Sequence, residues 1–243
     1  MGELTVVGIG PGGYADMTVR ADRALAGCEV IVGYHVYVDL VRDRYPDKEF
    51  LTTPMTREAE RCRMALDAAK AGRRVAMVCS GDSGIYGMAG LLFELRGESQ
   101  DPEISVIPGL TAACSGGAVL GAPLTHDFAV ISLSDRLTAW ETIEKRLEAA
   151  AGADLSIVLY NPASKGRPDY LRRACEILLR QLPEDRPCGA ARNIGRTGES
   201  GEVLSLARLR DYPADMFCTV FIGNAQTRVI AGKLVTPRGY RHG

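Results

Sequence analysis

The chain has 243 residues, of which 46% are hydrophobic and 24% charged, the balance of an ordinary globular protein. Its 29 basic and 30 acidic residues nearly cancel, which argues against a general nucleic-acid or membrane-surface binder. Every apolar run falls well short of the ~20 residues of a membrane span. The chain begins Met1-Gly2-Glu3 and passes directly into a strand-like segment, so no signal peptide is expected. We expect a cytoplasmic protein that binds neither nucleic acid nor membrane.

The seven cysteines are scattered along the chain, odd in number and without a CxxC pair. This pattern argues against a disulfide framework and against a structural zinc site. It is typical of buried free thiols in a reducing compartment. We therefore expect no metal site.

In the first half of the chain, short β-type runs alternate with helical patterns. The strands are predicted at residues 4–9, 29–33, 75–78 and 104–107, and the helices at residues 16–26, 57–71, 85–96 and 111–120. Such alternation predicts a parallel sheet with right-handed crossovers.

After residue 125 the pattern restarts and ends in consecutive strands. Helices are predicted at 140–151 and 170–182, and strands at 128–133, 155–160, 188–192, 202–206, 217–222 and 229–234. Consecutive strands joined by short turns predict a mixed sheet. We therefore expect two α/β domains, comprising residues 1–121 and 122–243.

The most informative segment is VAMVCSGDSGIYGMAG at residues 75–90, in which an apolar strand ends in small residues. Without a Cβ in the way, the backbone groups of such a loop can approach a ligand closely. Loops at the carboxyl ends of strands are where open α/β sheets bind ligands. The alternative is a tight strand-to-helix turn with Asp82 or Ser83 as the helix N-cap.

A second glycine loop, Gly8-Ile9-Gly10-Pro11-Gly12-Gly13, satisfies the GxGxxG pattern and raises the alternative of a nicotinamide-dependent oxidoreductase. Two details weaken that alternative. Pro11 removes a backbone N–H from a loop whose value lies in such donors. Glu29 also precedes the second strand, whereas the fingerprint needs an acidic residue at its end. A ligand-facing turn of another kind is the better interpretation.

Later strand ends carry further candidates, each with a purely structural alternative. Tyr160 can pack a flat ligand or simply end its strand before an Asn-Pro turn. Arg192 and Arg196 can hold carboxylates or remain solvated loop arginines. His126 can act as an acid or base, but no serine at nucleophile-elbow spacing accompanies it, so a hydrolase triad has little support.

Taken together, these segments resemble the tetrapyrrole methylases, the S-adenosylmethionine-dependent enzymes of corrin and sirohaem synthesis. The resemblance covers nearly the whole chain and is carried by GIGPG at 8–12, CSGDSGIYGMA at 79–89, PGLTAACSGGAVLGAPLTHDF at 108–128, LYNPASKGRP at 159–168, ARNIGR at 191–196, MFCTVFIGN at 216–224 and TPRGY at 236–240. The LYNPASKGRP, RNIGR and TPRGY stretches look most like the ring-contracting precorrin-3B C17-methyltransferases. Another precorrin methylase, acting at a different carbon, is the alternative within the family.

The resemblance implies a homodimer whose two domains hold S-adenosylmethionine in the cleft between them, with S-adenosylhomocysteine as the product. It implies that the first glycine loop faces a tetrapyrrole substrate and that later strand ends hold the cofactor. The residues implied for the cofactor are Gly81, Asp82, Ser83, Ile85, Tyr86, Thr111, Ala112, Tyr160, Arg192, Asn193, Thr219 and Phe221.

On the substrate side, the resemblance directs attention to the first glycine loop, to aromatic side chains and to arginines that would clamp carboxylates. These residues are Gly10, Pro11, Gly12, Tyr34, Tyr37, Arg57, Arg61, Arg136, Arg167, Arg192 and Arg196. Ring contraction also needs a group that takes a hydroxyl proton, for which Asp82 and His126 are the candidates. Some ring-contracting relatives carry an added cysteine-rich iron–sulfur segment. This chain has no cysteine cluster, which favours the oxygen-dependent route.

Overall fold

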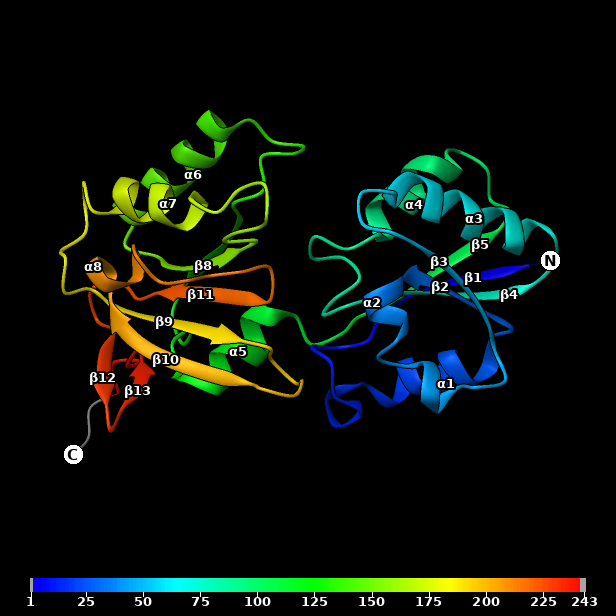
Figure 1. Cartoon of the computed structure of the whole chain (residues 1–243), viewed down its shortest axis with the longest axis horizontal. Coiled ribbons are helices and arrows are strands. Elements are labelled where there is room, and N and C mark those ends of the chain that lie inside the picture. The colour runs from blue at the N-terminus through cyan, green and yellow to red at the C-terminus, as the bar shows by residue number, and fades with distance from the viewer. Residues whose placement is uncertain (1, 241–243) are drawn as a thin grey trace. The chain divides into compact units, whose positions relative to one another are not determined.

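The computed structural model describes residues 2–240, and the chain divides between Thr111 and Ala112 into two compact units (Figure 1). The sequence placed the domain boundary later, between residues 121 and 122. The difference is helix α5 (Ala112–Leu120), which packs on strands of the second unit.

The first unit is built on a sheet of five strands that pair in parallel throughout. Its strands are β1 (Glu3–Gly8), β2 (Val30–Tyr34), β3 (Glu49–Thr53), β4 (Arg74–Cys79) and β5 (Glu103–Ile107), in the order β3-β2-β4-β1-β5. The predicted alternation of strands and helices is confirmed. Strand β3 was not predicted, because its sequence, EFLTT, lacks a continuous apolar run.

Helices cover both faces of this sheet (Figure 1). On one face, α1 (Val19–Gly27) and α2 (His35–Val38) pack on side chains such as Val7, Ile31 and Val78. On the other, α3 (Glu58–Lys70) and α4 (Ala89–Arg96) pack on neighbours such as Val6 and Met77. Successive strand residues face opposite layers, so both faces of the central strands β2, β4 and β1 are apolar.

Two helices of this unit begin later than the sequence predicted. Helix α1 starts at Val19, after the short 3-10 turn η1 (Tyr14–Asp16), and the side chain of Thr18 caps it by accepting the Ala21 N–H. Helix α4 starts at Ala89, four residues after the predicted Ile85, because the preceding loop has its own hydrogen bonds.

The second unit has a mixed five-stranded sheet, as predicted. Its strands are β7 (Phe128–Ser132), β8 (Ser156–Tyr160), β9 (Pro187–Arg192), β10 (Ser200–Ser205) and β11 (Cys218–Ile222), in the order β10-β9-β11-β8-β7. Strands β7 and β8 pair in parallel, and the other pairs are antiparallel.

Helices α6 (Trp140–Gly152), α7 (Tyr170–Leu178) and α8 (Leu206–Leu209) cover one face of this sheet, and α5 covers the other. The predicted strand 229–234 is instead a hairpin of β12 (Arg228–Ile230) and β13 (Lys233–Val235), which pairs with the short strand β6 (Gly121–Ala122). The turn falls at Ala231 and Gly232, which both adopt positive φ, as tight hairpin turns require.

Candidate active site

The carboxyl ends of β1 and β4 form a topological switch point in the first sheet. These strands are neighbours, but the chain leaves β1 for α1 on one face and leaves β4 for α4 on the other. In open α/β sheets, ligands bind outside the carboxyl ends of the strands at such a switch point.

Two glycines hold the loops together at this point. Gly10 and Gly81 form an isolated antiparallel bridge in which each backbone N–H donates to the other's carbonyl, with N–O distances of 3.1 and 2.7 Å. A Cβ at Gly109 would lie 2.1 Å from the Gly81 oxygen, and one at Gly8 would lie 2.6 Å from the Gly109 nitrogen. Three strand ends thus pack backbone against backbone, and peptide groups line the edge.

Asp82 organises the loop that follows β4. Its Oδ1 accepts the backbone N–H groups of Gly84 and Ile85 at 2.8 and 3.0 Å, and its Oδ2 accepts that of Gly109 at 2.9 Å. The buried Ser83 donates its hydroxyl to the Ile107 carbonyl at 2.9 Å. The carboxylate and the hydroxyl therefore both fix the β4 loop to the end of β5.

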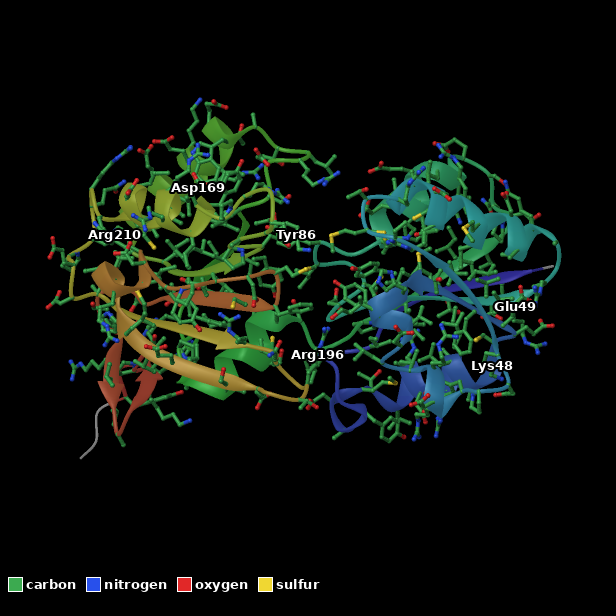
Figure 2. The ribbon with its side chains drawn as sticks, in the orientation of Figure 1. Lys48, Glu49, Tyr86, Asp169, Arg196 and Arg210 are labelled. Atoms are coloured by element: carbon green, nitrogen blue, oxygen red, sulfur yellow. The ribbon has the colours of Figure 1, made fainter. Side chains whose placement is uncertain are left out.

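Beyond Asp82 the loop exposes two large side chains. Ile85 is 42% exposed and Tyr86 55% exposed, and Figure 2 labels Tyr86 on the loop beyond β4. Tyr86 adopts φ +54°, a conformation that is uncommon for a bulky residue. Such strain is found at ligand-binding loops, where the surrounding structure holds it in place.

The first glycine loop departs from a dinucleotide fingerprint. In that fingerprint the glycines lead directly into a helix whose N-terminus faces the pyrophosphate. Here the residues after Gly13 form the turn η1, and helix α1 begins only at Val19. Helix α1 therefore does not present its first turn to Gly10, Pro11 and Gly12, an observation against the nicotinamide alternative.

An aromatic cluster lies at the end of β2. The Tyr34 ring makes edge contacts with the rings of His35 and Tyr37, at centroid distances of 4.5 and 5.2 Å. The guanidinium of Arg61 lies 5.8 Å from the Tyr34 ring centroid. Tyr34 and Arg61 thus come together at the same carboxyl edge of the first sheet.

The candidates of the second unit lie at one edge of its sheet, where β8 and β9 end and the antiparallel β11 begins. The Tyr160 hydroxyl accepts the backbone N–H of Ala113, in the first turn of α5, at 2.7 Å. Thr219 is buried near the start of β11. Ala112 lies beside Ala113, whereas Thr111 is a buried residue at the end of the first unit.

Arg192 is engaged within the second unit. Its Nη1 donates to the carboxylate of Asp215, and its Nη2 donates to the Pro213 carbonyl. Asp215 also accepts the N–H of Phe217 at 2.8 Å. The guanidinium therefore fixes the segment before β11.

Phe221 and Asn193 contribute to this edge through packing and backbone shape. Phe221 is 1% exposed and packs beneath α5, where a Cβ on Gly116 would come within 3.1 Å of its ring. Asn193 adopts φ +50° just after β9. In this structure the Phe221 side chain is part of the core.

The remaining arginine candidates are dispersed. Arg57 pairs with Glu60 at 3.2 Å on the surface of the first unit. In the second unit, Arg167 donates to Ser134 at 2.8 Å and pairs with Asp135 at 3.2 Å. Arg136 is exposed in the loop after β7, and Arg196, labelled in Figure 2, lies 5.6 Å from the Phe217 ring centroid.

His126 contacts the C-terminal segment of the second unit. Its Nε2 lies 3.0 Å from the carbonyl oxygen of Pro237. A carbonyl only accepts, so Nε2 carries the hydrogen, and in the neutral ring Nδ1 remains an acceptor. His242, the last histidine of the chain, lies outside the described residues.

Sequence reasoning missed the partners that make these residues structural. Asp215 was not singled out, although it holds Arg192, and Gly109 was not expected to bind Asp82. The Pro108-Gly109 step after β5 was the available signal, because a glycine there permits close backbone approach.

Within residues 2–240, no group of three His, Cys, Asp or Glu side chains is arranged to hold a metal ion. Among the same residues, no helix combines the length and the apolar character needed to cross a membrane. Six of the seven cysteines are buried free thiols, and Cys114 is exposed.

Comparisons with known proteins point to one family. The family model of the tetrapyrrole (corrin/porphyrin) methylases matches residues 3–210. A probable cobalt-factor III C(17)-methyltransferase of Salmonella typhimurium is 46% identical over 98% of this chain and 99% of its own length. A precorrin-3B C(17)-methyltransferase of Sinorhizobium is 39% identical over 98% of this chain and 97% of its own.

Solved structures confirm the α/β fold. The crystal structure of the methyltransferase CobJ superimposes with a TM-score of 0.91 at 39% identity, covering 98% of this chain and all of that one. A uroporphyrin-III C-methyltransferase from Thermus thermophilus, solved with S-adenosylhomocysteine, gives a TM-score of 0.68 at 21% identity over 91% of this chain and 92% of its own. The second likeness is one of fold alone.

Proposed function

The chain belongs to the tetrapyrrole (corrin/porphyrin) methylases, and we propose that it methylates precorrin-3B at C17 and contracts the ring, in cobalamin biosynthesis. One observation carries the proposal. Two curated relatives named for C17 methylation match this chain at 46% and 39% identity over almost their full lengths. Similarity from end to end favours a shared reaction over a shared fold alone.

The chemistry suits the residues at the first sheet's edge. S-adenosylmethionine, when bound, supplies a methyl group on a sulfonium, a reactive centre that needs no protein nucleophile. The protein's task is to hold two reactants in line and keep water out. The switch point supports this role, because its glycines let three strand ends pack backbone against backbone and so fix the loops at the edge where a ligand would bind.

The fit of the cofactor to the first unit rests on the β4 loop. Gly81, Asp82 and Ser83 form a fixed turn, and Ile85 and Tyr86 expose apolar surface beyond it. We propose that this fixed turn and the two exposed side chains run along the amino-acid and ribose part of the cofactor. Of the residues predicted in the second unit, Tyr160 and Arg192 now have structural partners. The adenine-binding role of the whole set stays a prediction.

The substrate is a flat polycarboxylate, which basic and aromatic groups recognise. The first glycine loop, Tyr34 and the arginines are proposed for this purpose. For ring contraction, Asp82 is already occupied by three backbone N–H groups, so we propose that it organises the loop. His126 keeps an acceptor nitrogen and stays the second candidate for the base.

The decisive experiment incubates the purified protein with precorrin-3B and methyl-labelled S-adenosylmethionine. Mass spectrometry and NMR of the product establish whether one methyl group enters and whether it lies on C17 of a contracted ring. Methylation at another carbon would support another member of the family. Binding of NADH in a calorimetric titration, with no binding of S-adenosylhomocysteine, would contradict the proposal.

A second candidate substrate is the cobalt-bearing counterpart, because the relative at 46% identity is named for cobalt-factor III. Parallel assays with and without cobalt in the tetrapyrrole separate the two. The predicted homodimer is tested by sedimentation, and the predicted cytoplasmic location by cell fractionation.

A further inference from the structure

We propose that Arg61 is the anchor for one carboxylate of the tetrapyrrole substrate. The inference rests on the proposed function and deepens it, since it assigns one residue to one substrate group. Arg61 lies in the first turn of α3, and its side chain reaches the carboxyl edge of the first sheet. That edge also holds the glycine switch point.

The position of the guanidinium is set by two neutral acceptors at the end of β3. Its Nε donates to the Thr53 hydroxyl at 3.0 Å, and its Nη2 donates to the Pro54 carbonyl at 3.1 Å. The Tyr34 ring, at the end of β2, lies 5.8 Å away. The head group is therefore fixed between two strand ends and beside an aromatic ring.

The charge of Arg61 has no acidic partner within residues 2–240, although the residue is only 5% exposed. The acidic residues nearby in sequence are engaged elsewhere, since Glu58 accepts the Thr56 N–H and Glu60 pairs with Arg57. The adjacent thiols are neutral, because burial raises the pKa of Cys62 to about 12 and that of Cys79 to about 11.

This arrangement is unfavourable for the protein alone. A buried charge without a counter-charge is costly, and a cation in the first turn of a helix opposes the helix dipole. Arg186, another buried arginine, lies 3.7 Å from Asp154 and so has an acidic neighbour. A neutral side chain that donates hydrogen bonds would be enough to link α3 to β3. We therefore infer that the positive charge of Arg61 is there to bind an anion.

The third nitrogen of the fork is available for that anion. Nη1 of Arg61 has no hydrogen-bond acceptor in the described part of the chain. It is also not among the unpaired nitrogens that are sealed from solvent there, which belong to Arg96 and Arg186. Nη1 therefore keeps some exposure to solvent. A planar guanidinium matches a carboxylate, and the Tyr34 ring beside it matches a flat ring system.

The test compares Arg61→Gln and Arg61→Lys with Arg63→Gln, an exposed arginine of the same helix that supplies the matched loss of charge. We measure KM for precorrin-3B over a range of salt concentrations, the Kd of S-adenosylhomocysteine and the Tm. For Arg61→Gln we expect KM to rise about ten- to hundredfold, with a shallower dependence of KM on salt and an unchanged Kd. Arg61→Lys retains part of the affinity, and Arg63→Gln matches the wild type.

Thr53→Val tests the structural alternative, because it removes one acceptor and keeps the charge. We expect it to lower Tm and leave the salt dependence of KM intact. The proposal is overturned if Arg61→Gln keeps the wild-type KM and salt dependence, or if Thr53→Val reproduces both of its effects. If Arg61→Gln does not fold, Arg61→Lys decides, since an unchanged KM there also overturns the proposal. Absence of methyl transfer by the wild type would instead refute the proposed function.

Discussion

Gly10 and Gly81 join the two loops of the candidate site through a reciprocal pair of backbone hydrogen bonds. Both residues adopt positive φ, +75° and +69°, which an L side chain rarely accepts. The bridge ties the loop proposed to face the substrate to the loop proposed to hold the cofactor. Damage at one glycine should therefore affect both ligands.

Gly10→Ala tests this link. A Cβ at Gly10 would lie 2.8 Å from the Asp16 carbonyl oxygen in addition to the positive φ, so we expect a loss of about 1–3 kcal/mol in unfolding free energy. Urea unfolding measures the loss, and calorimetry should show weaker binding of S-adenosylhomocysteine. Gly90→Ala in α4 is the control, because its Cβ meets open space and alanine favours helix. A Gly10→Ala protein with wild-type stability and cofactor affinity would refute the link.

Asp82 offers a test that separates its two roles. If the carboxylate organises the loop, Asp82→Ala leaves the N–H groups of Gly84, Ile85 and Gly109 without their acceptor, and the Kd of S-adenosylhomocysteine rises about ten- to hundredfold. Asp82→Asn keeps one acceptor oxygen and should bind with intermediate affinity. If Asp82 is instead the base, both variants bind the cofactor normally and fail at ring contraction. Titration calorimetry and product analysis distinguish these outcomes.

The strands that the sequence predicted best are those with continuous apolar runs, such as β4 and β8. The local sequence pattern could not place the start of α4, because Ile85 and Tyr86 are residues that suit a helix. The hydrogen bonds of Asp82 to Gly84 and Ile85 instead hold this segment in a loop, and the helix begins at Ala89. It also could not find the hairpin of β12 and β13, whose turn lies within an apolar run. In each case a contact or a backbone angle outweighed the residue preference.

Glycine spacing predicted the loops of the candidate site well, whereas the chemistry of single side chains depended on distant partners. Asp82 looked like either a cap or a base until its bond to Gly109 was known. The Arg61 guanidinium is held by Thr53 and Pro54, at the end of β3, a strand that the sequence did not predict. Long-range contacts of this kind leave no local pattern to read.

A pH-dependent contribution to stability is predicted at Asp22. The hydroxyl of Tyr45 at 2.6 Å, followed by Arg44 at 3.1 Å, lowers the pKa of the Asp22 carboxyl. Because this pKa is lower in the folded than in the unfolded protein, the ionised carboxyl stabilises the fold. The contribution is complete at pH values above the unfolded pKa of about 3.9, and it is lost as the pH falls through the folded pKa. Asp22→Asn should therefore lower Tm at pH 7 and approach the wild type as the pH falls through the lowered folded pKa.

Asp43→Asn is the control for this measurement, because Asp43 is an exposed aspartate close by in sequence. Its substitution should change Tm little at any pH. A Tm difference between wild type and Asp22→Asn that stays constant from neutral to acid pH would contradict the predicted linkage. The result bears on the site, because Asp22 also accepts the hydroxyl of Tyr14, in the turn that follows the first glycine loop.

The thiols should differ sharply in reactivity. Burial raises the pKa of Cys175 to about 12 and that of Cys218 to about 11. It also raises the pKa of the other buried cysteines, which are Cys28, Cys62, Cys79 and Cys188. Thiolate is the reactive form, so these six thiols should resist maleimide at pH 7.5 while the exposed Cys114 reacts. Mass spectrometry of the native protein should show one adduct, and Cys114→Ser should show none.

Helix α5 carries Cys114 one residue after Ala113, whose N–H binds Tyr160. Protection of the Cys114 thiol by S-adenosylhomocysteine would therefore further support a cofactor role for that edge of the second sheet. Several adducts on the native protein would contradict the burial of the other six.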